Sequence, residues 1–499
     1  MSITLLDSMR KRLARRGAIA VGSPQSRRRP TYRPAPNDSA DAAAQREAKR
    51  PEREQTFITR MVNKWWTRLL EAVYEGSLSE QEAEYESHCT KRDYLWNTVG
   101  IGVWGMVFPL LTVVTTQLVG AEQAGMFSMA FVTGTLLMIA ASYGVRNFQV
   151  SDIDEVDSFS SYQVNRWITG ALALVAGILY CTFRDYSPDM MTISLGVYVY
   201  KMVDGIADVY EGRLQQADKL YLAGISQALR SLAVAAAFSL ALFITRSLPL
   251  ASVAMAVVAV ASLALLTIPL ALLETEKSRG MRLEEITGLL RRCFPLFTAL
   301  FLFNLIESMP KFVMEGMLPY DNQLYFNALY FPAQGILLAI GFVYKPQLLR
   351  LASIWSNPRK RRRFDLVVAA MMVVVLAVTV FSGVMMAWIG IPVMSFMYGV
   401  DFERFRMLAY LMIAAGGITA AIDFLYAIIT VLRRQGDVMK LYLISFAASV
   451  IAPLVLVALL GLMGAVISYL LVMALLLVLL IVEYVHIRRA ITRERNPFA

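Results

Sequence analysis

The stretch FPLFTALFLFNLIESMPKFVMEGMLPY, residues 294–320, decides the fold of this chain. It is long and apolar enough to span a bilayer, whose hydrocarbon core takes about 20 helical residues. Four polar side chains interrupt it, namely Asn304, Glu307, Lys311 and Glu315. At about 100° per residue they fall within one stripe roughly 80° wide. Because a charge facing lipid costs about 2.5–3.5 kcal/mol on insertion scales, the stripe is expected to face other helices or a water-filled cavity.

Two interpretations of this stripe remain open from the sequence. In the first, Lys311 and a carboxylate form a buried pair that locks two helices together. In the second, the stripe is the wall of a solvated transport cavity, and its polar groups contact a substrate or carry protons. An ionisable side chain inside a membrane segment is by default a hypothesis for a functional site.

The composition extends the membrane assignment to most of the chain. Of 499 residues, 57% are hydrophobic and 17% are charged, and the mean hydropathy is +0.52. A soluble protein of this size carries about 25% charged residues. The sequence therefore predicts an all-α, polytopic membrane protein. The net charge of +10 does not indicate a nucleic-acid partner, because the Lys and Arg residues lie in alternate loops beside the spans, as topology control requires.

About twelve spans are expected after Tyr94. Their ranges are 95–118, 126–145, 165–183, 190–210, 221–243, 252–273, 294–316, 324–344, 366–390, 407–430, 441–460 and 464–485. One set of alternate loops carries several times more Lys and Arg than the other, and we expect that set to be cytoplasmic. Both termini are then cytoplasmic, as an even number of spans requires.

The expected domain organisation follows the charged loops. Residues 1–60 are predicted to be a disordered basic cytoplasmic tail, and 61–93 a cytoplasmic or interfacial helical segment. Residues 94–273 form a first lobe of six spans, 274–293 a cytoplasmic linker, 294–486 a second lobe of six spans, and 487–499 a basic cytoplasmic tail. Transporters built from two such halves bind their substrates between them.

A second polar stripe lies in the fourth span. Lys201, Asp204, Asp208, Glu211 and Gln215 occupy one helix face about 80° wide. The spacings i,i+3 and i,i+4 let neighbours interact. This stripe is either an ion-pair ladder that packs helices or a set of coupling groups for transport.

Isolated polar groups supply further candidates. Arg146 ends the second span, where it either reaches water or binds a phosphate bidentately. Arg230 lies deeper, in the fifth span. It pairs either with a buried carboxylate, such as Asp204 or Asp208, or with a ligand. Asp423, in the tenth span, is a candidate for proton coupling or for an interhelical hydrogen bond.

The eighth span mixes aromatic and amide side chains. Tyr325, Tyr330 and Gln334 suit sugar hydroxyls, and packing contacts explain them equally well. Pro332 can open the helix backbone where water or neighbours accept the freed carbonyl.

Catalytic and cofactor motifs were sought and not found in the sequence. There is no Walker, Rossmann or nucleophile-elbow pattern, so the chain is not expected to be an enzyme or to hydrolyse ATP. Its two histidines, His88 and His486, lie near opposite ends of the chain, and no cofactor or metal site is expected. Its three cysteines, Cys89, Cys181 and Cys293, form no CxxC pair and are expected to be free thiols.

Four segments resemble the Wzx-type polysaccharide flippases. The stretch YLWNTVGIGVWGMVFPLLTVVTTQLVGAEQAGMFSMAF (94–131) contains a loop of the form LG-x-x-x-x-G, here residues 119–125. SYGVRNFQVSD (142–152) then ends a span in Gly-x-Arg. YEGRLQQADKLYLAGISQALR (210–230) is similar to the family's link between the fourth and fifth spans, and FPLFTALFLFNLIESMPKFVMEGML (294–318) to its seventh span.

The resemblance implies membership of the multidrug/oligosaccharidyl-lipid/polysaccharide (MOP) exporter superfamily, with two six-helix lobes in a V around a central cavity. The implied substrate is an undecaprenyl-diphosphate-linked oligosaccharide, moved from the inner to the outer leaflet of a bacterial plasma membrane. Membrane lipids and polysaccharide-assembly enzymes (a polymerase and glycosyltransferases) are the implied partners. The implied cationic groups for the diphosphate are Arg146, Arg230, Lys311 and Lys345.

Three other functions compete with this one. A cation-coupled multidrug extruder of the MATE type, with the same architecture, would use membrane carboxylates such as Asp204, Asp208 and Glu307. A lipid II flippase of the same superfamily would move a peptidoglycan precursor. A non-transporting scaffold would recruit enzymes through its basic loops and N-terminal tail.

Overall fold

The computed structural model describes residues 82–152, 155–345, 361–432 and 435–495, together with positions 348, 351 and 355. The described residues from His88 onward belong to one compact unit. The predicted 1–60 tail lies outside the described residues, as do most of segment 61–93 and the last four residues of the C-terminal tail.

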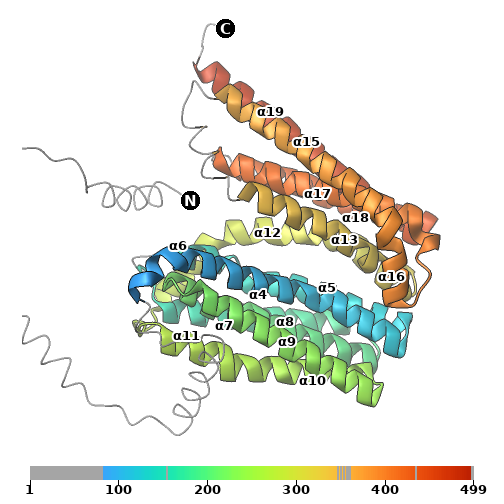
Figure 1. Cartoon of the computed structure of the whole chain (residues 1–499), viewed down its shortest axis with the longest axis horizontal. Helices are drawn as coiled ribbons and strands as arrows, with labels where there is room; N and C mark the ends of the chain where they lie inside the picture. Colours follow the sequence, from blue (N-terminus) through green and yellow to red (C-terminus); the bar gives the residue numbers. More distant parts are fainter. Residues whose placement is uncertain are drawn as a thin grey trace, which may run out of the picture. The chain divides into compact units, whose positions relative to one another are not determined.

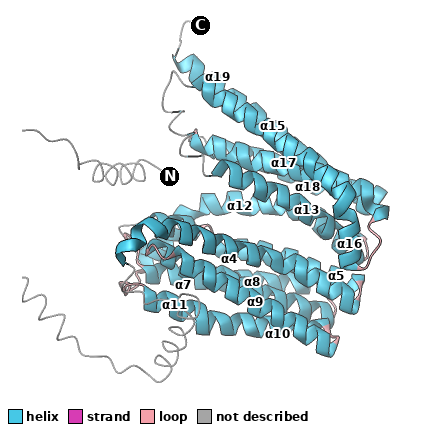
Figure 2. Ribbon diagram, in the orientation of Figure 1, coloured by secondary structure: helices cyan, strands magenta, loops and turns pink. Residues whose placement is uncertain are grey.

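Most of the described residues are helical, as predicted (Figure 2). The first half of the unit contains α4 (Glu82–Val119), α5 (Ala121–Ser142), α6 (Val145–Ser151), α7 (Phe159–Phe183), α8 (Pro188–Gln216), α9 (Leu220–Thr245), α10 (Leu248–Ser262), the π-helix η1 (Leu263–Thr267) and α11 (Ile268–Glu274). The second half contains α12 (Leu283–Met317), α13 (Asp321–Tyr344), α15 (Arg361–Met385), the π-helix η4 (Met386–Gly390), α16 (Ile391–Tyr398), the short 3₁₀ helix η5 (Glu403–Phe405), α17 (Arg406–Val431), α18 (Gln435–Leu460) and α19 (Leu462–Arg495).

Many of these helices are long and apolar enough to span a membrane. By length and composition, 11 helical segments of the described residues can cross a membrane. The helix α8 is absent from that set because of its charged residues, although it has 29 residues and packs against α5, α7, α9 and α10. With α8 included, the structure agrees with the predicted number of spans and confirms a polytopic helical membrane protein.

The helices pack in two sets (Figure 1). In the first set α8 contacts α5, α7, α9 and α10; in the second, α17 and α19 contact each other and α13. The helices α12 and α13 also pack against α5, which joins the sets. At one end, α16 and the α12–α13 connection meet the first set. Toward the end that carries α6, α15 and α19 diverge from α4 and α6 (Figure 1).

Local sequence explains where several helices begin and end. Ser187 caps α8, its side chain accepting a hydrogen bond from the backbone N–H of Met190, and Pro188 occupies the first turn, where no N–H partner is needed. Gly461 separates α18 from α19 with φ of 59°, the conformation that glycine adopts most readily. Pro332, in contrast, lies inside α13 without ending the helix.

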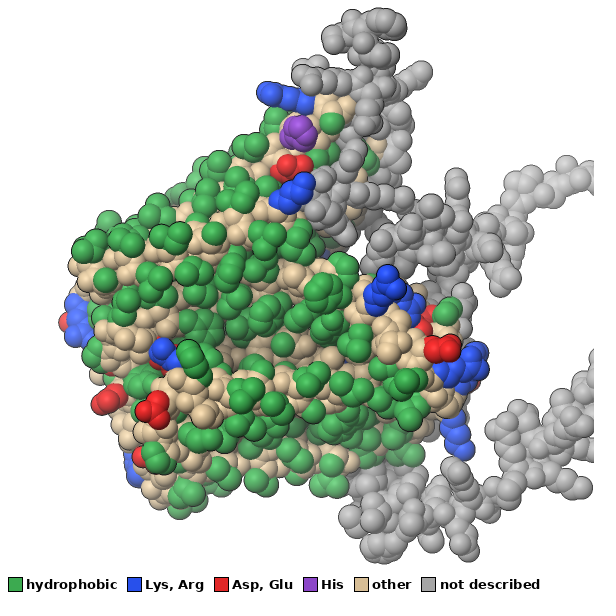
Figure 3. All heavy atoms as spheres, turned by 180° about the vertical axis from the view of Figure 1, so that it is seen from behind, with side chains coloured by type: hydrophobic (Ala, Val, Ile, Leu, Met, Phe, Trp, Pro, Cys, Tyr) green, Lys and Arg blue, Asp and Glu red, His purple; other side chains and the backbone are tan. Residues whose placement is uncertain are grey.

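The outer surface suits a lipid environment. Large exposed hydrophobic side chains include Leu172 on α7, Val257 on α10 and Leu376 on α15. Figure 3 shows hydrophobic side chains over the middle of one face and charged side chains gathered toward its two ends. This distribution matches a protein whose middle lies in hydrocarbon and whose ends lie in water.

The predicted domain limits fall within helices at two places. The limit at 93/94 lies inside α4, which runs without a break from Glu82 into the first span. The predicted linker 274–293 contains the end of α11 and the first turns of α12, so its extended part is 275–282.

Candidate functional site

The polar stripe of α8 forms an ion-pair network in the first set of helices, buried at Lys201, Asp204, Glu211 and Arg230 and partly exposed at Arg146 and Asp208. Asp208 accepts a hydrogen bond from Arg146 of α6 at 2.5 Å and one from Arg166 of α7 at 2.8 Å. The Arg166 side chain is fully buried, and its second contact is the carbonyl of Ala141. Arg146 also donates to Gln215 at 3.1 Å. Asp208 therefore joins three helices.

Arg230 forms the second centre of this network. Its guanidinium donates to Asp204 at 3.2 Å and to Glu211 at 2.8 Å. Lys201 approaches Asp204 to 3.7 Å, and the indole of Trp104 donates to the same carboxylate at 2.8 Å. Asp204 is therefore the partner of Arg230 that the sequence left open.

The network has four cations and three carboxylates. Its cations are Lys201, Arg146, Arg166 and Arg230, and its carboxylates are Asp204, Asp208 and Glu211. Each carboxylate contacts at least one guanidinium. Such an arrangement resembles the helix-packing ladder more than a set of free coupling groups, because paired buried charges hold one another in place.

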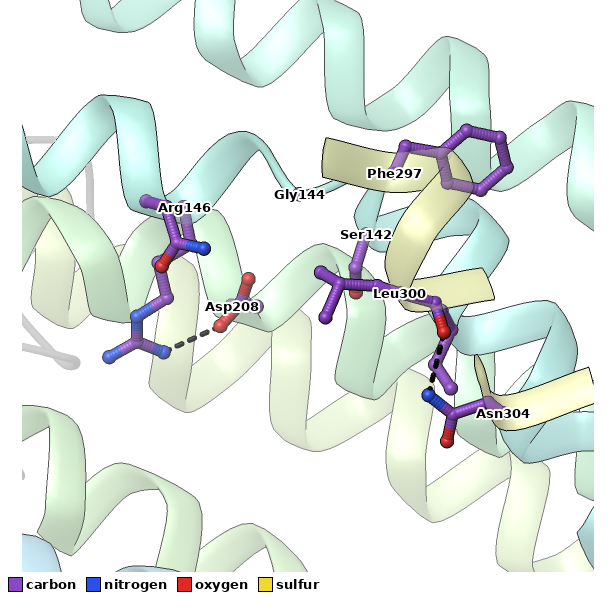
Figure 4. A pocket seen from close by; sticks show the side chains of 9 residues that line it. Ser142, Gly144, Arg146, Asp208, Phe297, Leu300 and Asn304 are labelled. Atoms are coloured by element: carbon purple, nitrogen blue, oxygen red, sulfur yellow. Dashed lines mark hydrogen bonds and ion pairs between the residues drawn. The ribbon is translucent and has the colours of Figure 1, made fainter. Parts of the chain in front are cut away.

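A small pocket lies beside this network, at the end of the unit that carries Arg146. Its volume is about 150 Å³. Its lining residues are Ile139, Ser142, Gly144, Arg146, Asn147, Asp208, Phe297, Leu300 and Asn304. Figure 4 shows the Arg146–Asp208 pair on one side and Asn304, which donates to the carbonyl of Leu300, on the other. The pocket thus brings predicted residues of both lobes together.

The stripe on α12 has a different character. Glu307 accepts hydrogen bonds from the hydroxyls of Tyr330 and Tyr469, both at 3.2 Å. Lys311, one turn later, is 5% exposed, and its ammonium lies 4.1 Å from the ring centre of Tyr330. Among the described residues, no carboxylate lies within 4.0 Å of this ammonium. Of the four predicted substrate cations, Lys311 alone has no ion pair in the part of the chain that the structure describes.

Glu315 contacts the first set of helices, although it lies on α12. Its carboxylate accepts hydrogen bonds from Tyr180 at 2.8 Å and from Tyr186, and Arg184 lies 3.2 Å away. The Glu315 side chain is 1% exposed. Burial and the nearby carboxylate raise the pKa of Tyr186, so the phenol stays protonated and donates.

The remaining predicted residues lie apart from these groups. Asp423 accepts a hydrogen bond from Tyr344 at 2.6 Å and lies 4.0 Å from Lys345. Tyr325 packs against Phe405, with ring centres 4.9 Å apart. Gln334 is partly exposed on α13.

Several partners in these contacts were not predicted from the sequence. They are Trp104, Arg166, Tyr180, Arg184, Tyr186 and Tyr469. An arginine at the start of the apolar span 165–183 was the available signal for Arg166. The tyrosines carried no comparable signal, because aromatic residues are common in membrane helices.

Among the described residues, no group of three or more His, Cys, Asp or Glu side chains is placed so that it could hold a metal ion. Cys181 and Cys293 are buried free thiols, while the side chain of Cys89 lies outside the described residues.

Comparison with known proteins identifies the fold. No protein-family model and no curated protein matches the sequence. Among solved structures, an inward-facing MATE-family multidrug resistance transporter of the MOP superfamily is similar, with a TM-score of 0.51, 13% identity, and coverage of 81% of this chain and 100% of that one. An outward-facing structure of a MATE-family multidrug resistance transporter of the MOP superfamily has a TM-score of 0.50 and 12% identity, and the match covers 81% of this chain and 95% of that one. A MOP superfamily transporter from Pyrococcus furiosus has a TM-score of 0.50 and 12% identity, and the match covers 82% of this chain and 96% of that one.

The chain therefore has the MOP transporter fold, as predicted.

Proposed function

We propose that the protein is a flippase for undecaprenyl-diphosphate-linked oligosaccharides, and that it moves them from the inner to the outer leaflet of a bacterial plasma membrane. The MOP fold supports transport, and the resemblance of four segments to Wzx-type flippases supports this substrate. Under the predicted topology both termini are cytoplasmic, and so is the end that carries Arg146.

The observation that carries the proposal is the Lys311 ammonium, which has no carboxylate within 4.0 Å among the described residues and only the more distant Glu307, one turn earlier on α12, as an opposite charge. Taking a charge out of water costs several kcal/mol, and Glu307 offsets only part of this cost because it makes no contact with the ammonium within 4.0 Å. A diphosphate would supply the missing anion and would gain charge-assisted hydrogen bonds in return. Tyr330, whose ring faces the ammonium at 4.1 Å, offers an aromatic surface beside the same position.

The pairing of the acidic residues on α8 favours an anionic substrate over an organic cation. A cation extruder needs carboxylates that are free to exchange partners. Asp204, Asp208 and Glu211 already contact arginines. Arg146, which has both Asp208 and Gln215 as partners, lies at the pocket and would guide the diphosphate toward Lys311.

In the proposed cycle the diphosphate enters from the Arg146 end while the lipid chain stays in the bilayer. The two sets of helices then rock, as repeat-built transporters do, and expose Lys311 to the opposite side. Tyr325, Tyr330 and Gln334 on α13 would contact sugar hydroxyls. Glycosyltransferases would act before this step, and a polymerase would act after it.

Complementation of a deletion strain tests the function. Lys311→Ala should abolish surface polysaccharide while the protein remains in the membrane fraction. Lys219→Ala, which removes a partly exposed lysine paired with Glu274, is the matched control and should restore polysaccharide. Normal polysaccharide from the Lys311→Ala strain would remove Lys311 from the site. Lysis on depletion would favour lipid II, and altered drug susceptibility with unchanged polysaccharide would favour an extruder.

A further inference from the structure

The contacts of Glu315 join two halves of the molecule that must separate during transport. Glu315 lies near the end of α12, in the second half, whereas its partners lie on α7 and the connection that follows, in the first half. We call this group, consisting of Glu315, Tyr180, Arg184 and Tyr186, the latch. The carboxylate is 1% exposed, so its partners replace water completely.

A second contact at the same end involves backbone. A Cβ atom added to Gly125 of α5 would lie 1.8 Å from the carbonyl oxygen of Tyr320, which belongs to the connection between α12 and α13. Only a residue without a side chain allows this approach. The glycine is also the last residue of the LG-x-x-x-x-G-like loop, which gives that position a physical role.

A third contact lies between α4 and α16. The Gln117 side chain donates to the carbonyl of Met397 at 2.7 Å, and Gly399 lies next to the same amide. Three independent contacts therefore close the Glu315 end. At the other end α12 carries polar contacts to the first half, such as Arg292 with Asp157 at 2.6 Å, while α15 and α19 diverge from it (Figure 1).

From this geometry we infer that the latch is the gate that holds the Glu315 end of the transport pathway shut, with Gly125 as the residue that lets the gate close fully. The inference rests on the proposed transport function only in requiring that this end opens. Opening separates α12 from α7, and Glu315 then loses two phenol donors and one guanidinium. The strength of these contacts sets how often the gate opens.

Cysteine labelling tests the gate without any substrate. Ala124 is fully buried and packs with core residues of the second half, so a cysteine there reports on opening. Ala124→Cys is placed in a background with Cys89→Ala, Cys181→Ala and Cys293→Ala. The full-length protein in nanodiscs is then treated with a hydrophilic maleimide. Glu315→Gln should speed labelling about tenfold, because hydrogen bonds to a charged group are lost.

Smaller changes keep the test valid if Glu315→Gln fails to fold. Tyr186→Phe and Tyr180→Phe each remove one hydroxyl and should speed labelling to a lesser extent. Glu403→Gln is the matched control, because Glu403 pairs with Arg406 on the exposed surface of the second half and should leave the rate unchanged. Equal labelling rates for Tyr186→Phe, Tyr180→Phe and the parent would overturn the gate. If the latch variants speed labelling while the Lys311→Ala strain makes normal polysaccharide, the gate is supported and only the proposed role of Lys311 is refuted.

Discussion

Glu307 and Glu315 lie about two turns apart on α12, and the carboxylate of each accepts hydrogen bonds from two tyrosine hydroxyls. The tyrosines of Glu307 belong to the second half of the molecule, and those of Glu315 to the first. Lys311 lies between the two carboxylates without an ion pair among the described residues. One helix face thus anchors α12 to both halves and leaves a cation between the anchors.

The first prediction concerns the stability of Lys311 variants. Lys311→Met removes a buried ammonium and keeps an unbranched side chain, so thermal stability in detergent should be unchanged or higher. Surface polysaccharide should nevertheless be lost. A group kept for function rather than for stability shows this opposite response. A marked fall in the unfolding temperature would instead indicate that Lys311 serves to hold the helices together.

The second prediction concerns Asp208. Asp208→Asn leaves the fully buried Arg166 without its carboxylate. Breaking a fully buried pair costs about 3–5 kcal/mol, and a smaller cost is expected here because the Asp208 side chain is 24% exposed. The unfolding temperature should fall clearly. Glu403→Gln provides the comparison, since its pair with Arg406 is half exposed and such pairs contribute about 1 kcal/mol or less. Equal stability of the two variants would show that the network is not structural.

The third prediction concerns the close approach at Gly125. Gly125→Ala must displace the Tyr320 backbone, because the added Cβ would lie 1.8 Å from its carbonyl oxygen. This variant should lower the unfolding temperature and weaken transport. Gly102→Ala, at a helical glycine with open space around it, should be neutral or stabilising by up to about 1 kcal/mol. Normal stability and transport in Gly125→Ala would mean that the two backbones separate at little cost.

The helices could be predicted from the sequence because each apolar run is long enough to span a bilayer. The stripes could be predicted too, because helical periodicity places Lys201, Asp204 and Asp208 on one face. The Lys201–Asp204 pair is present at 3.7 Å. Helical spacing did not reveal which helices supply the arginines: α9 supplies the arginine that contacts Asp204, whereas α6 and α7 supply those that contact Asp208.

Partners from distant helices could not be predicted. Tyr186 lies 129 positions from Glu315, and Tyr469 lies 162 positions from Glu307. Only the packing of helices decides such pairs, and a single sequence contains no signal for it. For the same reason the contact of Lys345 with Asp423, at 4.0 Å, could not be predicted from the sequence.

Binding of a diphosphate lipid to the purified protein tests the central claim most directly. Undecaprenyl diphosphate should bind to the wild-type protein in nanodiscs, and undecaprenol, which has the same chain without the diphosphate, should bind far more weakly. Lys311→Gln should reduce affinity for the diphosphate lipid about tenfold or more, since it removes a charge-assisted contact, and should leave binding of undecaprenol unchanged. Equal affinity of wild type and Lys311→Gln for undecaprenyl diphosphate would contradict the account.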